Sequence, residues 1–276
     1  MENNTIVYGK NAVIEALEAN NRTFNKILIS SNAHSDSKIE KIKELASKQG
    51  IVFQFVNMQK LNQIEPEGRH QGVIAQISPV KYIELDDFIE KHKGELTKVV
   101  VLDGVEDSHN VGAIIRSCVC AGVKGIILPS RRGVLINSTV EKTSAGAVNH
   151  ISIIKVNSLV NAIQRLKEND YWVIASDHHA KDNYFNIDYT NMNFALIMGA
   201  EHAGISRSLL KLSDFVVKIP MLTNFNSLNV SNAAAIILFE MVRQEVEKNG
   251  KKSDTLNLII DDISDEGVDF NSIEPV

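Results

Sequence analysis

The sequence predicts an α/β protein with a mostly parallel, doubly wound sheet, preceded by a small α/β domain. Short β-branched runs alternate with helix-patterned stretches from Thr97 to about Glu247, which is typical of a parallel sheet covered on both faces. The first 78 residues show a smaller alternation of the same kind. The chain has 276 residues, enough for one large domain or two small ones with a full core.

Residues 1–78 are predicted to form the smaller domain. Its helices and strands are expected, in the order helix, strand, helix, strand and strand, at Gly9 to about Asn20, Lys26 to Ser30, Ser37 to Gln49, Ile51 to Val56 and Gly72 to Ile77. The loop before the last strand carries Arg69, His70 and Gln71 between two glycines. Such a loop is most often a solvated surface turn, and contact with RNA is the functional alternative.

Residues 79–96 are predicted to form a linker between the domains. Charged residues dominate this segment, among them Glu84, Asp86, Asp87 and Glu90, and it has few apolar anchors. Domain boundaries usually fall in such polar stretches. The segment is therefore expected to hold a short helix at most.

Residues 97–248 are predicted to form the larger domain. Its strands are expected at Lys98–Leu102, Gly125–Leu128, Ile151–Lys155, Tyr171–Ser176, Ala195–Met198 and Phe215–Ile219. The helices are expected at Val111–Ala121, Ser138–Ala147, Leu159–Asn169 and Ser206–Leu212, with a final alanine-rich helix that continues to about Glu247.

Charge and hydropathy limit the classes of protein. The net charge is −5, and residues 249–276 hold two lysines against seven acidic residues, so the rest of the chain is neutral. A neutral body neither excludes nor indicates RNA as a partner. The acidic end is expected to be a disordered tail. The chain has no apolar run of membrane-spanning length and no signal peptide, which favours a cytoplasmic protein.

Common cofactor and metal patterns are missing. No Gly-x-Gly-x-x-Gly follows the strand that ends near Asp103, and no Gly-x-x-x-x-Gly-Lys-Ser/Thr occurs, which argues against dinucleotide and P-loop sites. The histidines show no metal-ligand spacing. His178 and His179 are adjacent at a strand end and are expected to point apart. The sequence therefore predicts no metal.

Three polar loops follow strands of the larger domain. The first runs from Asp103 to Arg116, and Asn110 in it is expected to cap the next helix. Arg116 lies about one turn past Gly112 and is expected to lean back toward the helix start. A guanidinium beside free helix-end amides forms a natural phosphate site, although an exposed helix arginine taken alone is more often a solvated charge.

The second loop starts at Gly199, where glycine would let a ligand approach the main chain. Glu201 two residues later would accept a hydrogen bond from a ligand or hold Arg116 in place. Taken alone, Gly-x-Glu is more often an ordinary turn.

The third loop starts where Pro220 stops a strand. Ser227, Asn229 or Ser231 is expected to cap the helix that follows. Ligands of open α/β sheets bind at the carboxyl ends of the strands. The three loops are therefore expected to meet around one small ligand.

Together the loops resemble motifs one, two and three of the SpoU (TrmH-like, SPOUT) RNA ribose 2′-O-methyltransferases. The runs that carry the resemblance are Asn110-Val111-Gly112-Ala113-Ile114-Ile115-Arg116, Gly199-Ala200-Glu201 with Gly204, and Ile219-Pro220-Met221 with Ser227-Leu228-Asn229-Val230-Ser231. Those that resemble the 23S rRNA guanosine branch, RlmB, are Tyr8-Gly9-Lys10-Asn11-Ala12-Val13, His70-Gln71-Gly72 and Ser144-Ala145-Gly146-Ala147-Val148.

The resemblance implies S-adenosylmethionine as methyl donor, a trefoil-knotted catalytic domain, an L30e-like RNA-binding N-terminal domain, and a homodimer whose active site is shared across the interface. It assigns methyl transfer to Asn110, Arg116, Glu201 and Asn229. Around the cofactor it places Gly199, Ile219, Met221, Ser227 and Leu228. The candidates for RNA contact are Arg69, His70, Gln71, Arg131 and Arg132.

Three residues depart from the family pattern. Thr223 stands where the family usually has glycine, and Ala200 and His202 occupy positions more often filled by Asn or Ser and by Gly or another small residue. A β-branched residue at positive φ is strained. The loop at Thr223 is therefore expected to be reshaped, with an effect on cofactor affinity.

The implied function is methylation of a ribose 2′-hydroxyl in RNA, with a guanosine of 23S ribosomal RNA as the favoured target. A tRNA guanosine is the rival substrate. The N-terminal domain favours rRNA, because tRNA-specific relatives often carry helical extensions instead. The alternative from another class is a non-catalytic RNA-binding or ribosome-assembly factor on the same scaffold.

Overall fold

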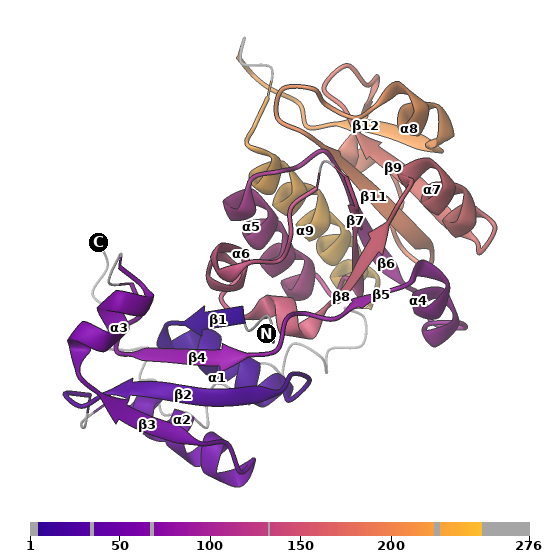
Figure 1. The fold of residues 1–276 in the computed structure, drawn as a ribbon. Coiled ribbons are helices and arrows are strands. Elements are labelled where there is room, and N and C mark those ends of the chain that lie inside the picture. The colour runs from indigo at the N-terminus through magenta and orange to yellow at the C-terminus, as the bar shows by residue number, and fades with distance from the viewer. Residues whose placement is uncertain (1–4, 34–35, 67–68, 132, 224–226, 250–276) are drawn as a thin grey trace.

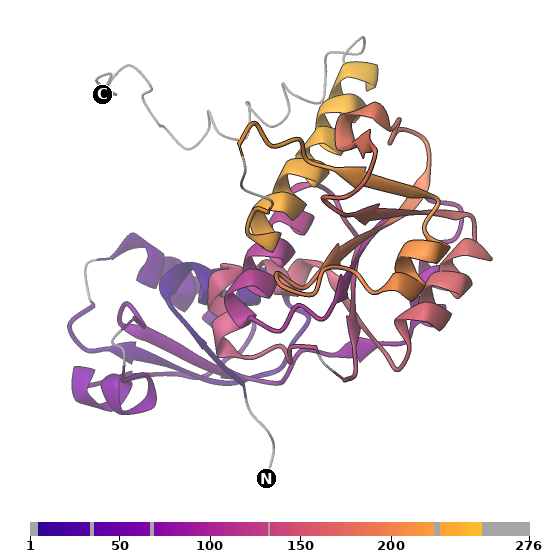
Figure 2. The same ribbon diagram turned by 90° about the horizontal axis from the view of Figure 1, so that it is seen from above.

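The computed structural model describes residues 5–33, 36–66, 69–131, 133–223 and 227–249. They form two lobes, an N-terminal and a C-terminal domain, which meet along one side (Figure 1 and Figure 2). Arg132 and the expected acidic tail after Asn249 lie outside the described residues. Within the described part, no helix is both long and apolar enough to cross a membrane.

The N-terminal domain is a four-stranded sheet in the order β1-β4-β2-β3, with helices on both faces. β4 runs antiparallel to β1 and β2, and β3 runs parallel to β2. Its elements are β1 (Thr5–Tyr8), α1 (Lys10–Ala19), β2 (Phe24–Ser30), α2 (Ser37–Lys48), β3 (Phe53–Val56), α3 (Met58–Ile64) and β4 (Val73–Ile77). The sequence does not predict β1 and α3, because both are short and α3 buries a single side chain, Leu61.

The C-terminal domain is built on strands in the order β10-β12-β9-β11-β6-β7-β8-β5. All neighbouring pairs in this described sheet are parallel, which confirms the predicted fold class; the knot stays a prediction. The strands are β5 (Tyr82–Ile83), β6 (Lys98–Asp103), β7 (Gly125–Pro129), β8 (Ser152–Val156), β9 (Tyr171–Ser176), β10 (Asp182–Asn183), β11 (Asn193–Gly199) and β12 (Phe215–Lys218).

Helices cover both faces of this sheet (Figure 1). α5 (Ser108–Cys120), α6 (Ser138–Thr143) and α9 (Val230–Asn249) pack on one face, and α4 (Leu85–Lys91), α7 (Leu159–Lys167) and α8 (Arg207–Leu212) on the other. β6 shows why the strands read as continuous apolar runs. Val100 and Leu102 point into the first core and Val99 and Val101 into the second, because successive strand side chains alternate between faces.

The expected linker belongs to the C-terminal domain. Its β5 pairs with β8, and Leu85, Phe88 and Ile89 of α4 are buried in the core. The prediction of a linker over residues 79–96 is therefore wrong. Three buried side chains on one helix anchor the segment despite its many charges.

Helix α6 is shorter than predicted. It ends at Thr143, because Ala145 and Gly146 have φ of 52° and 88°, and left-handed residues terminate a helix. A short 3₁₀ helix, η1 (Ala147–His150), follows the turn.

Phe88→Ala should lower the free energy of unfolding by about 3–5 kcal/mol, because it removes a ring buried in the core. Urea denaturation followed by circular dichroism measures the change. Leu96→Ala is the control, since that side chain is 60% exposed and its loss should change stability by less than about 0.5 kcal/mol. Equal effects of the two substitutions would show that α4 is not part of the core.

Candidate functional site

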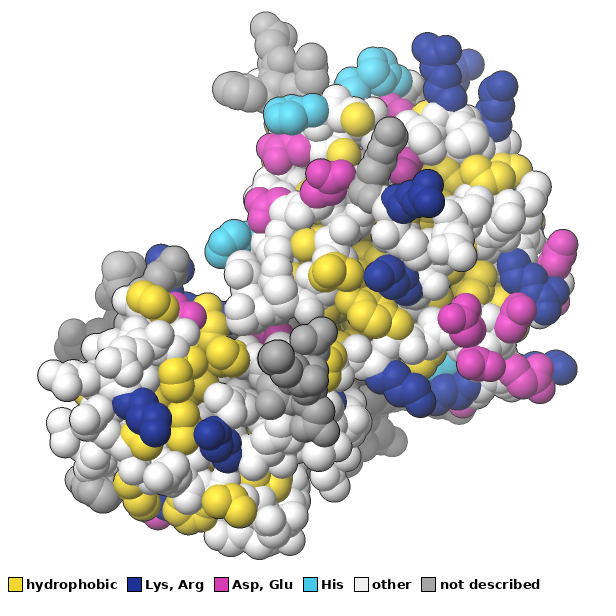
Figure 3. Space-filling model, in the orientation of Figure 1, with side chains coloured by type: hydrophobic (Ala, Val, Ile, Leu, Met, Phe, Trp, Pro, Cys, Tyr) yellow, Lys and Arg dark blue, Asp and Glu magenta, His cyan; other side chains and the backbone are white. Residues whose placement is uncertain are grey.

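The loops after β9, β11 and β12 meet around a cavity of about 370 Å³. This carboxyl edge of the sheet is at the top of Figure 1, and histidine side chains gather there in Figure 3. The predicted cofactor contacts Gly199, Ile219, Met221, Ser227 and Leu228 all line the cavity. The remaining described lining residues are 176–179, Met198, 200–205, Val230 and Ala233.

Gly199 allows the chain to fold back at the end of β11. Ala200 and Gly204 form a β-bridge, and a Cβ on Gly199 would lie 2.3 Å from the carbonyl carbon of Gly204. The sequence predicts that glycine here admits a ligand to the main chain. The structure shows that it admits the backbone of the loop itself, so a larger residue would force the turn open.

A side-chain hydrogen bond ties the first loop to the third. Nδ2 of Asn229 donates to Oδ1 of Asn110 over 2.9 Å. Oδ1 of Asn229 accepts from the main-chain N and the hydroxyl of Ser231 at 2.9 and 2.6 Å, so Asn229 caps α9. The prediction that Asn110 caps α5 is wrong. The helix starts earlier and is capped by Asp107, which leaves the amide of Asn110 for the bond to Asn229.

Glu201 lies between the first cavity and a second one of about 540 Å³. The two cavities share residues 200–204 and Val230. Asn110 and Arg131 line the second cavity as well. The structure therefore brings the predicted residues Asn110, Glu201 and Arg131 together beside the predicted cofactor contacts.

Arg116 lies elsewhere. It is exposed on α5 and lines a groove of about 620 Å³ between the two domains, together with Glu15 and His150, and it is absent from the described lining of both cavities. The prediction that it leans toward the first loop, within reach of Glu201, is wrong for a single chain. Arg116 lies six positions after Asn110, which is not a whole number of turns at about 3.6 residues per turn, so the two side chains leave α5 in different directions.

His70, a predicted RNA contact in the loop before β4, is buried. His70 is 2% exposed, its Nδ1 accepts from the main-chain N of Gly72 at 3.0 Å, and its Nε2 is 2.9 Å from Oδ1 of Asn62. Burial lowers the pKa of His70, so the ring is neutral at neutral pH. The prediction that it contacts RNA is wrong here, because both ring nitrogens are engaged in holding the loop.

Arg69 and Gln71 remain at the surface. Oε1 of Gln71 accepts from the main-chain N of Lys10 at 3.1 Å. Gln71 also lines a polar pocket of about 540 Å³ with Lys10, Asn11 and Lys38. The first turns of α1 and α2 both border this pocket. Asp36 also lines it, pairs with Lys10 and accepts from the main-chain N of Lys38 and Ile39, so lysines and a carboxylate share one place.

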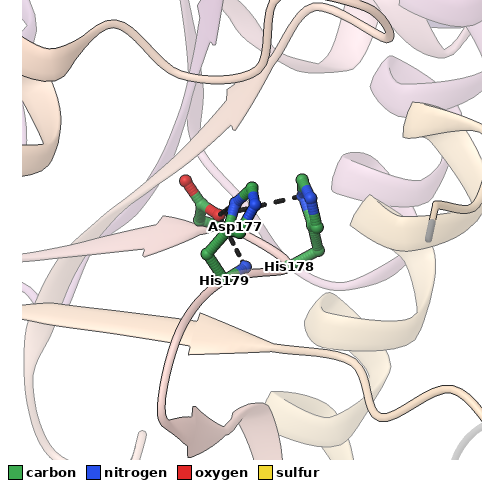
Figure 4. Close-up of side chains that lie close together, drawn as sticks. All are labelled: Asp177, His178 and His179. Atoms are coloured by element: carbon green, nitrogen blue, oxygen red, sulfur yellow. Dashed lines mark hydrogen bonds and ion pairs between the residues drawn. The ribbon is translucent and has the colours of Figure 1, made fainter.

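Asp177, His178 and His179 lie together in the wall of the first cavity (Figure 4). The two imidazole centroids are 3.7 Å apart, so the prediction that the histidines point apart is wrong. They belong to a turn after β9, where strand alternation no longer applies.

These three side chains offer ligand atoms within 4.8 Å of one another. However, Oδ1 of Asp177 already accepts from N and Nδ1 of His179 at 2.8 and 3.1 Å. The side chains of His178 and His179 are 53% and 79% exposed, unlike the closed four-ligand shell of a structural zinc site. These side chains form part of the cavity wall, and the absence of a metal stays a prediction.

The sequence does not single out the side chain of Asp103 as functional. Its Oδ2 accepts from the main-chain N of Ser206 at 2.7 Å, and it lines the second cavity. The signal is its position, because Asp103 is the last residue of β6 and the turn at 177–179 directly follows β9, at the same carboxyl edge as the three predicted loops.

The departures from the family pattern lie in different places. Ala200 and His202 line both cavities. Thr223 is exposed and outside the described cavity lining. An effect of these departures on a ligand would therefore come first from Ala200 and His202.

Asn229→Ala should lower the free energy of unfolding by about 1 kcal/mol relative to Asn229→Asp. Aspartate keeps the oxygen that caps α9, whereas alanine removes it; both lose the donor to Asn110. Thermal denaturation of the two variants measures the difference. Equal stabilities would contradict the capping role.

Two family profiles match the chain. "RNA 2'-O ribose methyltransferase substrate binding" matches residues 6–83, and "SpoU rRNA Methylase family" matches residues 97–239. A Bacillus subtilis (strain 168) protein named as the TrmH family tRNA/rRNA methyltransferase YacO is 38% identical over 240 residues, which cover 86% of this chain and 95% of that protein. A Staphylococcus aureus (strain MSSA476) protein with the same family name is 38% identical over 242 residues, which cover 87% and 96%.

Solved structures show the same architecture. The AdoMet-bound rRNA methyltransferase from Sinorhizobium meliloti is 26% identical, with a TM-score of 0.73 and 87% of each chain covered. The SpoU methyltransferase AviRb from Streptomyces viridochromogenes, in complex with AdoMet, is 23% identical, with a TM-score of 0.73 over 88% of this chain and 91% of AviRb, and it supports the fold alone. Since both domains are matched in order and relatives align over nearly their whole length, the chain belongs to the SpoU rRNA methylase family of RNA methyltransferases.

Proposed function

We propose that this chain transfers a methyl group from S-adenosylmethionine to a ribose 2′-hydroxyl of RNA, with a guanosine of 23S rRNA in the cytoplasm as the favoured target. The observation that carries the proposal is the meeting of the three motif loops at one edge of the sheet. The AdoMet-bound neighbour supports the cofactor. The match of residues 6–83 to a substrate-binding profile supports RNA as substrate.

The first cavity suits S-adenosylmethionine in size and lining. Its volume of about 370 Å³ lies within the range of roughly 300–1,000 Å³ for small-molecule sites. Met198, Ile219 and Leu228 offer apolar surface for the adenine ring, and Asp177 and Glu201 offer acceptors for hydroxyl and ammonium groups. When bound, the cofactor supplies an electrophilic methyl group.

The residues around the cavities suit a weakly acidic ribose hydroxyl. Positioning it in line with the methyl group contributes about 7–11 kcal/mol in favourable cases. The Asn110 and Asn229 pair would orient the ribose, because Asn110 lines the second cavity. Glu201, which borders both cavities, would accept from the hydroxyl or from Arg116. Arg116, whose guanidinium stays protonated, would stabilise the developing alkoxide or its flanking phosphate.

This role for Arg116 requires a homodimer. In one chain Arg116 lines the groove between the domains. Helix α9 packs on α5 and leaves Ile236 and Phe239 37% and 47% exposed, and exposed apolar side chains close together favour a protein contact. A second copy docked on α5 and α9 covers these side chains and brings its own cavity toward Arg116.

The N-terminal pocket supplies the contact to RNA. Lys10, Asn11 and Lys38 line it beside Asp36 and Gln71, and lysines bind phosphates. Arg69 on the same loop and Arg131 at the second cavity add charges on the two domains. RNA held at the first domain would thus extend to the second.

Calorimetric titration and mapping of 2′-O-methyl groups test the function. The purified protein should bind S-adenosylmethionine and methylate ribosomal RNA, with transfer RNA as the comparison. If the protein binds no S-adenosylmethionine at millimolar concentration, the methyltransferase hypothesis is wrong and the non-catalytic assembly factor is favoured. Methylation confined to transfer RNA would overturn the ribosomal target.

Arg116→Ala should lower kcat by about 10²–10³-fold and leave cofactor affinity unchanged, because Arg116 is outside the described lining of the cofactor cavity. Single-turnover methylation and calorimetry measure the two quantities. Arg165→Ala is the control, since Arg165 pairs with Asp86 and Glu168 on the far face of the sheet. Loss of cofactor binding together with activity would contradict this role.

Phe239→Lys should convert the dimer to monomers and abolish methylation, because it places a charge in the apolar contact. Light scattering after size-exclusion chromatography reports the mass. Val52→Lys changes another exposed apolar residue, on the N-terminal domain, and should leave the mass and activity unchanged. A fully active monomer would contradict the shared site.

A further inference from the structure

Buried contacts join the two domains. Arg22, between α1 and β2, forms an ion pair with Glu141 of α6, and the two side chains are 5% and 1% exposed. Exposed ion pairs contribute little to stability, but this one is closed off from water on both sides. Separating the domains would leave Glu141 beside the C-terminal core without its cation, which is costly for a buried pair.

Arg22 contacts three segments at once. Its Nε and Nη2 donate to the carbonyl of Ser78 at 2.8 and 2.6 Å, and its Nη1 reaches Oδ1 of Asn149 at 3.2 Å as well as Glu141. Ser78 directly follows β4 and Asn149 lies in η1. Only the planar fork of an arginine presents donors in this arrangement.

The turn after α6 fits against α1. Nδ2 of Asn21 donates to the carbonyl of Asn149 at 2.6 Å, and Nδ2 of Asn149 donates to the carbonyl of Gly146 at 3.0 Å. A Cβ on Gly146 would lie 2.5 Å from Cβ of Glu15, and φ at Gly146 is 88°. Glycine is therefore required both for the turn and for the close approach of α1.

The same segment also touches the helix that carries motif one. A Cβ on Gly112 would lie 2.7 Å from Cβ of Thr143 and 3.1 Å from N of Ser144. α5 and α6 are therefore in close contact at Gly112. Residues 141–149 thus contact the N-terminal domain on one side and α5 on the other. Asn110 and Arg116 both belong to α5.

We propose that Arg22, Glu141, Gly146 and Asn149, here named the interdomain joint, hold the RNA-binding domain at one fixed orientation relative to α5. Arg22 is a positioning residue, because it acts through the placement of the bound RNA and does not touch the reacting atoms. This inference rests on the proposed function for its RNA substrate. It implies that the substrate is a folded RNA that contacts both domains at once, and that a short oligonucleotide around the target is a poor substrate.

The test compares variants that open the joint in different ways in the full chain. Arg22→Ala leaves Glu141 unpaired, and Gly146→Ala pushes α1 away. The double variant Arg22→Met with Glu141→Met keeps the volume and removes both charges, which buried pairs often tolerate without unfolding. It still opens the joint, because methionine cannot donate to Ser78 and Asn149 as Arg22 does. Arg165→Ala removes two ion pairs within the C-terminal domain and is the matched control.

Three measurements separate positioning from folding. For the two single variants, kcat/KM on a long ribosomal RNA fragment should fall by about 10- to 100-fold, mainly through KM, with cofactor affinity unchanged. Activity on a short oligonucleotide should stay at its low wild-type level. Small-angle scattering should show a larger radius of gyration than for wild type or Arg165→Ala.

Two results would contradict the proposed role of the joint. One is an unchanged scattering profile in all three variants, and the other is an equal kcat/KM of the wild type on long and short RNA. If one single variant fails to fold, the double variant carries the test, with looser scattering and the same KM effect expected. Failure of the proposed function is distinguishable, because the wild type would then methylate no RNA while scattering still reports whether the joint opens.

Discussion

The parallel pairing of β11 between β6 and β9 is the constraint on which the site depends. Gly199, the last residue of β11, is in register with Asp103, the last residue of β6. Asp103 then holds the loop after β11 through its carbonyl to Ala200 N at 3.0 Å and through its carboxylate to Ser206 N at 2.7 Å. Loops that start nearly 100 residues apart therefore begin at the same level of the sheet.

This pairing explains what could be predicted from the sequence. Each of the longer strands is an apolar run bounded by polar residues, so its position and length can be predicted from the sequence. The bounds of β9, Tyr171–Ser176, are those predicted. Since parallel strands share one carboxyl edge, listing the polar residues after each strand finds most of the cavity. Gly199 and Glu201 were found in this way, whereas Leu228, an apolar residue well past the end of β12 at Lys218, came only from the resemblance to motif three.

What could not be predicted depends on contacts distant in sequence. His70 reads as a polar loop residue, and only the packing of α3 beside it, through Asn62, shows that it is enclosed. The many charges of the α4 segment suggest a linker, and the sequence pattern does not reveal that Phe88 packs against Gly125. A Cβ at Gly125 would lie 2.8 Å from the Phe88 ring. Arg116 likewise has a local sequence context that suits a phosphate, while the groove it lines is formed by residues of both domains.

The turn formed by Ala145 and Gly146 has a consequence for building hybrids between relatives. Gly146 leaves room for Glu15, and the carbonyl of Asn149 accepts a hydrogen bond from Asn21. The surface that contacts the first domain is therefore formed by residues of the second domain. A chimera that exchanges only the first 78 residues would separate the two halves of this fit. Transplanting a substrate preference from one enzyme to another would therefore require residues 141–149 to travel with the N-terminal domain.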